Sequence, residues 1–321
     1  MNQKKSKKRL IDRLLSKNDK KICIFDVGAL DGVKEPWSFL AEYTDAITSE
    51  PLESYGKKKF GIGGSSRTAP FFVTKKPDGS SILCPNKTLL EKYCGSSRFD
   101  VIEVTEIELA TLDEVLKKKQ VNELHFLKLD TQGSEYEIVN SSLKSLSTVI
   151  GIDIEVNILE RYQEQHGFLE VFSLLIENGF ELFDFQRRYA KRMGLEIVGY
   201  PQGQLTHGTA LFFRSPESLV VRLEAMGQAE RVQNIRIATA VYVAYGYLDT
   251  AAVFLRMCAE KGWDAEAGEI SSAIVKSGSW KFSLSSLPGS ARIAELLRRL
   301  YMLFQKSSHA GISGDRWLGP N

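Results

Sequence analysis

The sequence has few cysteines and no spacing that would let them act together. Four cysteines occur among 321 residues, and no two of them form a C-x-x-C pair. The four histidines show neither H-x-x-H nor H-x-E spacing. These absences argue against a disulfide framework and against a zinc site of the usual spacing. We therefore expect a reduced, cytoplasmic protein with no metal site.

Long apolar runs and a strong charge of one sign are also missing. No run approaches the length that a membrane span needs, and the N-terminus does not follow the signal-peptide pattern. The net charge is only +2, so composition gives no reason to expect nucleic acid or an acidic membrane as a partner. The apolar fraction of 43% is ordinary for a globular protein, and the length suits one large domain with a smaller one.

The sequence does contain a short apolar segment that ends in acid and glycine. Residues 22–27 form a nearly unbroken apolar run, which predicts a strand buried on both faces of a parallel sheet. Asp26 ends this run, and Gly28 and Gly32 follow it. Glycines at this point let the backbone approach a ligand closely, and we expect the next helix within residues 33–43.

A second acidic residue, Glu50, ends the next apolar segment, which covers residues 46–50. A carboxylate at that point of an α/β sheet can accept hydrogen bonds from both hydroxyls of a ribose. The first fifty residues therefore predict a nucleoside-binding half-domain.

Strands and helices alternate along the next part of the chain. Two apolar segments within 60–74 surround a Gly-Ser turn and predict a hairpin. The aperiodic stretch 77–99 has the length of a lid or an acceptor loop. Residues 101–109 predict an exposed strand, and Thr111 predicts the cap of a following helix. The remaining expected elements are strands at 125–130, 149–155, 180–185 and 208–214 and a helix at 168–178.

This order predicts an α/β fold with a mostly parallel sheet and an antiparallel hairpin at its C-terminal edge. Asp26, Glu50, Asp130 and Glu155 then lie at the carboxyl ends of strands, where open α/β sheets bind ligands. For Asp130 the alternative is a carboxylate that caps the next helix. For Glu155 a structural role is equally open.

The two ends of the chain differ from its middle. Residues 1–21 predict a short basic helix packed on the domain edge, with membrane or partner contact as the alternative. Residues 215–304 predict amphipathic helices, which we expect to form a small all-α domain with its own core; a protein-binding groove is the alternative. Residues 305–321 predict a flexible tail.

Several segments resemble the FkbM-type class I methyltransferases that depend on S-adenosylmethionine. The matching pieces are Phe25–Gly32, Glu50-Pro51, Thr111–Asp113, Leu127–Glu135, Glu155 and Gly203–Arg214. The resemblance implies a Rossmann-like methyltransferase domain over residues 22–214. It also implies S-adenosyl-L-methionine as the cofactor and an oxygen of a sugar, a polysaccharide or another small natural product as the acceptor.

The resemblance implies roles for single residues as well. The cofactor-binding residues that it implies are Asp26, Gly28, Asp31, Gly32, Glu50, Ile62, Gly63 and Asp130. Backbone around Gly28 and Gly32 would pack against the methionine part, and Glu50 would hold the ribose. The segment 61–65 would lie near the adenine, and Asp130 would face the cofactor or the acceptor.

Methyl transfer to an alcohol needs an in-line nucleophile and a general base. The candidate catalytic residues are Asp130, Glu155 and His207. Related sequences begin the last strand with an aspartate where this chain has Thr209. The chain is therefore expected to take another acceptor or to use His207 in place of that aspartate.

Two other functions remain open. A nucleotide-dependent oxidoreductase is disfavoured because Gly28 and Gly32 give G-x-x-x-G spacing in place of G-x-G-x-x-G. A non-catalytic scaffold that binds a protein partner through the helical region is disfavoured by the four acids, although Thr209 favours it mildly. The expected partner is a small-molecule or glycan acceptor, with no nucleic acid and no membrane span.

Overall fold

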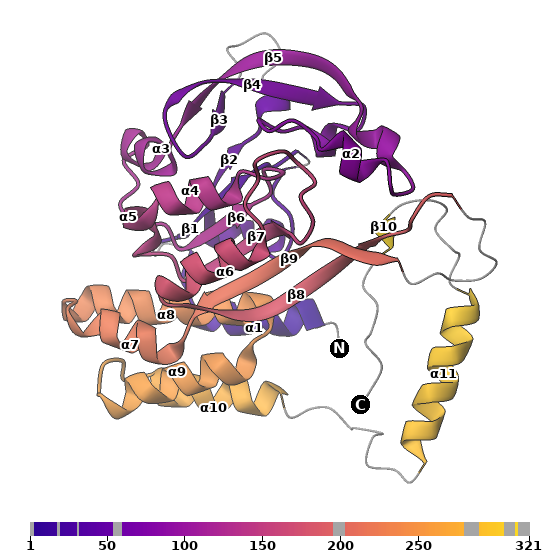
Figure 1. Ribbon diagram of the computed structural model, residues 1–321. Helices are drawn as coiled ribbons and strands as arrows, with labels where there is room; N and C mark the ends of the chain where they lie inside the picture. The colour runs from indigo at the N-terminus through magenta and orange to yellow at the C-terminus, as the bar shows by residue number, and fades with distance from the viewer. Residues whose placement is uncertain are drawn as a thin grey trace.

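The computed structural model describes residues 3–17, 20–30, 32–53, 60–194, 203–278, 289–304 and 312–313. A seven-stranded sheet lies at the centre, with the strand order β10-β8-β9-β7-β6-β1-β2 (Figure 1). Its strands are β1 (Ile22–Val27), β2 (Thr44–Ser49), β6 (Phe126–Leu129), β7 (Gly151–Asn157), β8 (Phe180–Ala190), β9 (Gln204–Arg214) and β10 (Ile312–Ser313). The predicted tail, 305–321, lies outside the described residues except for β10.

The directions of the strands confirm the predicted sheet. Strands β2, β1, β6 and β7 run parallel, whereas β9 is antiparallel to β7, and β8 is antiparallel to β9. Strand β1 lies between β2 and β6, so the chain leaves β1 on one side and later returns on the other. The carboxyl ends of β1 and β6 therefore flank the topological switch point, where sheets of this kind bind ligands.

One face of the sheet is covered by helices from the middle of the chain (Figure 1). These helices are α3 (Leu112–Lys118), α4 (Glu135–Ser141), α5 (Leu143–Leu146) and α6 (Phe168–Glu177). Successive strand residues point to opposite faces, and Phe25 and Val27 of β1 join Leu127 in the core on this side. Thr111 caps α3 as predicted. Its hydroxyl accepts a hydrogen bond from the backbone N–H of Glu114, and the Glu114 carboxylate accepts one from the backbone N–H of Thr111.

The other face is covered by α1 (Gln3–Leu14) and by α7 (Pro216–Glu224), α8 (Gln228–Tyr245), α9 (Leu248–Glu260) and α10 (Ala267–Gly278) (Figure 1). Ile24 and Phe126 from the strands share one core with Ile11, Tyr242 and Phe254 from the helices. A separate helical domain with its own core is therefore not confirmed, because these helices form a layer of the α/β fold. The basic N-terminal helix is packed into the same layer.

Helix α11 (Ser290–Phe304) stands away from this layer in Figure 1. No helix among the described residues combines the length and the apolar character that crossing a bilayer requires.

A smaller sheet arches over the carboxyl edge of the central one (Figure 1). It contains β3 (Phe60–Ile62), β5 (Val101–Ala110) and β4 (Arg67–Thr74), in that order. The predicted hairpin at 60–74 is wrong, because β5 inserts between β3 and β4 and pairs with both. Ile107 and Leu109 of β5 are buried and form one hydrophobic cluster with Ala69 and Phe71 of β4, which accounts for the pairing of β4 with β5.

The segment 33–43 also differs from the prediction. It contains the 3₁₀ helix η1 (Ser38–Tyr43) in place of an α-helix. The buried residues Trp37, Leu40 and Tyr43 recur every third position, which is the period of a 3₁₀ helix.

Candidate functional site

A cavity of about 300 Å³ lies where three strand ends meet the smaller sheet. Gly28 follows β1, Glu50 follows β2 and Asp130 follows β6, and all three residues line the cavity. Ile62 and Phe71 contribute apolar wall from the smaller sheet. A concave site of this size, with apolar walls and a few polar groups, suits a small ligand.

The β2 end of the cavity is polar, and one buried hydroxyl there has no hydrogen-bond partner among the described residues. The Glu50 carboxylate lines the cavity and accepts a hydrogen bond of 2.9 Å from the backbone N–H of Leu52. Beside it, the buried hydroxyl of Ser49 has no hydrogen-bond partner among the described residues. A buried polar group without a partner costs about 1–3 kcal/mol. A ligand with hydroxyl groups would satisfy Ser49 and bind Glu50, so this end fits a ribose.

Gly28 allows two loops of the site to touch. Its φ is +85°, and a Cβ atom at this position would stand 2.0 Å from the carbonyl oxygen of Asp130. The backbone N–H of Asp130 in turn donates to the carbonyl of Val27 at 3.0 Å. Gly32 differs: its φ is +73°, a Cβ would meet nothing within 4 Å, and the residue does not line the cavity. The predicted cofactor residue Asp31 lies outside the described residues.

Asp26 is not among the residues that line the cavity, and its contact with the cofactor stays a prediction. Its carboxylate accepts a hydrogen bond of 2.7 Å from the ammonium group of Lys128 on the neighbouring strand. The reason is the alternation of side chains along β1, which turns Asp26 to the same face as Ile22 and Ile24. That face packs against the helices of the C-terminal layer.

Gly63 has a structural role in the smaller sheet. Its N–H donates to the carbonyl of Ala110 at 3.0 Å, and a Cβ there would stand 2.9 Å from Leu109. Gly63 therefore allows close packing on β5, and it is absent from the cavity lining, whereas Ile62 lines the cavity.

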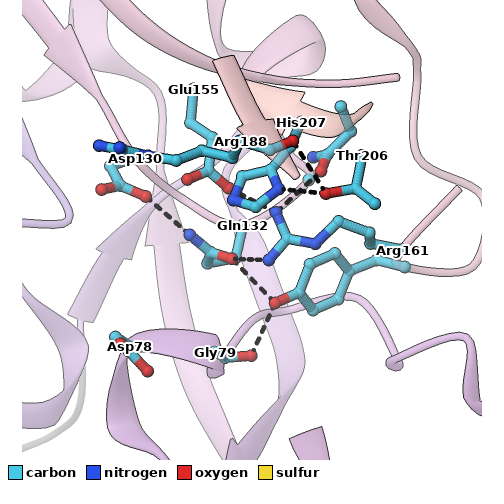
Figure 2. Close-up of polar contacts among 12 residues, drawn as sticks. Asp78, Gly79, Asp130, Gln132, Glu155, Arg161, Arg188, Thr206 and His207 are labelled. Carbon is cyan, nitrogen blue, oxygen red and sulfur yellow. Dashed lines mark hydrogen bonds and ion pairs between the residues drawn. The ribbon is translucent and has the colours of Figure 1, made fainter. Parts of the chain in front are cut away.

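A polar network joins Asp130 to the segment after β7 (Figure 2). The side-chain amide of Gln132 donates to Asp130 at 2.7 Å, and its oxygen accepts from Arg161 at 3.3 Å. Arg161 also donates to Glu155 and to Asn157, each at 3.0 Å. The network thereby links the carboxyl ends of β6 and β7 at the wall of the cavity.

Tyr162 extends this network to the 77–99 segment. Its hydroxyl lies 2.9 Å from the carbonyl oxygen of Gly79 and 2.9 Å from the side-chain oxygen of Gln132. The ring is fully buried, and burial raises the pKa of the hydroxyl. Tyr162 thus stays neutral and fixes part of the predicted acceptor loop over the site.

The helix-capping alternative for Asp130 is wrong. Glu135 instead accepts from the backbone N–H groups of Thr131 at 2.8 Å and Gly133 at 2.9 Å. Burial raises the pKa of Glu135 to about 7. Because Glu135 satisfies the turn before α4, the carboxylate of Asp130 is left on the cavity wall.

Glu155 lines the same cavity and lies next to Thr209 in the pairing of β7 with β9. Burial, followed by the charge of Asp130, raises the pKa of Glu155, and the Arg161 guanidinium opposes that rise. A carboxylic acid with a raised pKa can take up a proton nearer to neutral pH than an ordinary one.

His207 is buried and lines the cavity, but its chemistry differs from the expected general base. Its Nδ1 lies 2.9 Å from the hydroxyl of Thr206. Burial, and then the charges of Arg161 and Arg188, lowers the pKa of His207 to about 2. An imidazole so weakly basic stays neutral and is a poor proton acceptor. It is suited instead to hydrogen bonding with a ligand.

A second cavity, of about 730 Å³, adjoins the first. It lies between the 75–99 segment and the carboxyl edge of the sheet, and its lining includes Tyr93 and Phe99. The residues that line both cavities are Pro77, Asp78, Arg98, Arg161 and His207. Two adjoining cavities that share lining residues could hold two small molecules side by side.

Sequence reasoning missed Gln132, Arg161 and Arg98 as residues of the site. Gln132 stands two residues after Asp130, within a motif that was noted for other reasons. Arg161 lies in an irregular segment and Arg98 in the short 3₁₀ helix η4 (Ser96–Phe99). Neither has a sequence periodicity that would mark a buried or a cavity-lining side chain. Among the described residues, no group of three or more histidine, cysteine, aspartate or glutamate side chains is placed to hold a metal ion.

Comparison with known proteins identifies one family. The model of the methyltransferase FkbM domain matches residues 26–182. The match begins within β1 and ends within β8, so it includes Glu50, Asp130 and Glu155 but stops before His207. Comparison with curated proteins gives no match.

Proposed function

We propose, from the match of residues 26–182 to the methyltransferase FkbM domain, that the protein is an O-methyltransferase that uses S-adenosyl-L-methionine. The acceptor in this proposal is a hydroxyl group of a sugar, a polysaccharide or a small natural product. The observation that carries the proposal is the cavity at the switch point, with Glu50 and the unsatisfied Ser49 at one end and Asp130 and Glu155 at the other.

The residues present fit the cofactor. Glu50 and Ser49 would hold the ribose hydroxyls, and the apolar wall at Ile62 would lie against the adenine. The carboxylates of Asp130 and Glu155 line the cavity, and negative charge there favours a sulfonium cation. S-adenosylmethionine supplies a methyl group that is already activated by its positive sulfur, so the chain mainly has to position the acceptor and handle its proton.

Placement of the acceptor falls to the residues between the two cavities. An in-line hydroxyl about 3–3.5 Å from the methyl carbon would supply much of the rate. The neutral imidazole of His207 and the guanidinium of Arg161 line both cavities and would orient the acceptor. Asp130 is the proposed general base, because it lines the cavity and its network holds one carboxylate oxygen in a fixed position. Glu155, held by Arg161, is the second candidate.

Calorimetry distinguishes this proposal from its alternatives. We expect the protein to bind S-adenosylmethionine and S-adenosylhomocysteine and to ignore NAD. Binding of NAD alone would instead identify an oxidoreductase. Binding of none of the three would identify a scaffold whose partner lies elsewhere.

The cytoplasm is the proposed location, which the four free cysteines support.

A further inference from the structure

We propose that the second cavity binds a methyl acceptor that carries an acidic group, either a carboxylate or a phosphate on a sugar. This inference rests on the proposed function, because it assigns the second cavity to the acceptor. It concerns the class of acceptor, which the family match leaves open.

The charges along the second cavity are the first argument. Its charged lining residues are Lys75, Lys76, Asp78, Arg98 and Arg161. Arg98 pairs with Asp78 at 2.7 Å, and Arg161 pairs with Glu155 at 3.0 Å. Lys75 and Lys76 are exposed and have no ion-pair partner among the described residues. Two positive charges therefore remain uncompensated, and a cavity lined by one sign of charge concentrates ligands of the other sign.

Arg98 provides the second argument, because one of its donors has no acceptor. Its Nη2 group binds Asp78, but its Nε–H is buried without a hydrogen-bond partner among the described residues. The side chain lines both cavities. An arginine with an unused donor suits a carboxylate or a phosphate oxygen, since such charge-assisted hydrogen bonds are the strong ones. The guanidinium of Arg98 thus offers positive charge at the boundary of the two cavities, where an acidic group would bind.

The rest of the wall suits a sugar ring. Tyr93 and Phe99 are mostly buried, yet both line this cavity, together with Leu89 and Leu90. Apolar walls with a few convergent polar groups are typical of sites for small molecules. An acidic group bound at Lys75, Lys76 and Arg98 would leave the ring against these side chains. Its hydroxyls would then face Arg161 and His207, at the boundary with the first cavity.

The positive field reaches that boundary. The charges of Arg161, Arg188 and Arg98, added to burial, lower the pKa of His207. A cation arriving as acceptor would add to this repulsion, whereas an anion would relieve it. The geometry and the charges therefore favour the same class of ligand.

The test titrates three sugars into the protein saturated with S-adenosylhomocysteine: glucuronic acid, glucose 6-phosphate and glucose. We expect one or both acidic sugars to bind at least about tenfold more tightly than glucose, as charge complementarity predicts. The preferred one tells whether the acidic group is a carboxylate or a phosphate. The double variant K75Q/K76Q should weaken the acidic sugar about tenfold, two exposed ion pairs being lost. Arg98→Gln should also weaken it. The affinity for S-adenosylhomocysteine should stay unchanged in K75Q/K76Q, because these two lysines line the second cavity and not the first.

Lys117→Gln is the matched control, because Lys117 is an exposed lysine on α3, which contributes nothing to this cavity. Three results would overturn the inference. Glucose could bind as tightly as the acidic sugars, neither acidic sugar could bind, or the affinity for the acidic sugars could be the same in both variants as in the parent. If S-adenosylhomocysteine itself does not bind, the proposed function fails. If it binds and the sugars show no preference for acid, only this inference fails.

Discussion

The guanidinium of Arg161 lies 3.0 Å from the carboxylate of Glu155, and the two side chains are only 7% and 13% exposed. Each charge is buried, so each depends on the other for compensation. Arg161 belongs to the segment after β7, whereas Glu155 lies within the strand. Their ion pair therefore fixes that segment against the carboxyl end of the sheet, beside both cavities.

Removing one partner of this pair should destabilise the fold strongly. Arg161→Gln leaves Glu155 buried without a counter-ion and should lower the free energy of unfolding by about 3–5 kcal/mol. The double variant, with Glu155→Gln added, should recover most of that loss, since no uncompensated charge remains. Urea unfolding of the two single variants and the double variant measures this coupling. A double variant that is no more stable than Arg161→Gln alone would show that the two charges are not coupled.

Two glycines of the loop after β1 should respond differently to substitution. Gly28→Ala places a Cβ atom 2.0 Å from the Asp130 carbonyl at a φ of +85°, so the two loops must separate. We expect a loss of about 3 kcal/mol or more from overpacking and strain together. Gly32→Ala has open space and should cost only the backbone strain, about 1–2 kcal/mol. Equal losses in thermal unfolding would contradict the proposed contact between the loops.

Glu50 should contribute to cofactor affinity. Glu50→Gln should weaken the binding of S-adenosylhomocysteine by about 1–3 kcal/mol, the cost of charge-assisted hydrogen bonds to the ribose. Glu91→Gln, at an exposed glutamate outside the cavity lining, is the control and should bind as the parent does. Calorimetry on the three proteins measures the difference. An unchanged dissociation constant for Glu50→Gln would remove this residue from the ribose site.

His207 should make stability depend on pH in a defined direction. Its pKa falls from 6.5 to about 2 in the folded state, so between these values the unfolded chain binds a proton that the folded chain does not. The free energy of unfolding should therefore rise with pH through this window, by up to about 1.4 kcal/mol per pH unit, and level off above the unfolded pKa.

The variant His207→Asn should lose that slope. Glu135, whose pKa burial raises to about 7, gives the opposite slope, and subtracting the two proteins' curves removes its contribution. Urea unfolding from about pH 5 to 8 provides the comparison. Parallel curves for the parent and the variant would mean that His207 binds its proton equally well in both states.

The sequence predicted the framework because its signals are local. The apolar run of β1 and the strand ending at Asp130 are short and unambiguous, and the acids that end strands follow from strand direction alone. The hairpin at 60–74 failed because β3 and β4 pair with residues of β5 that lie 27 to 48 positions further along the chain. The helices after residue 215 were placed by their periodicity, but periodicity does not say which surface an apolar stripe covers.

The site residues also divide into those that local sequence signals predict and those that only contacts in space identify. Glu50 and Asp130 were predictable because the carboxyl end of a parallel strand has a known use. Asp26 also lies near the end of a strand, but its carboxylate binds Lys128 on the neighbouring strand and does not line the cavity. Arg161 was not predictable, since an arginine in an irregular segment looks the same whether it is solvated or buried. Only its three acceptors in space identify it.

The most direct test of the central claim is a crystal structure of the protein with S-adenosylhomocysteine. We expect the nucleoside in the cavity at the switch point, with its ribose hydroxyls on the Glu50 carboxylate and its sulfur toward Asp130 and Glu155. A ligand bound elsewhere, or a cavity filled by the protein's own side chains while the ligand stays in solution, would contradict the account.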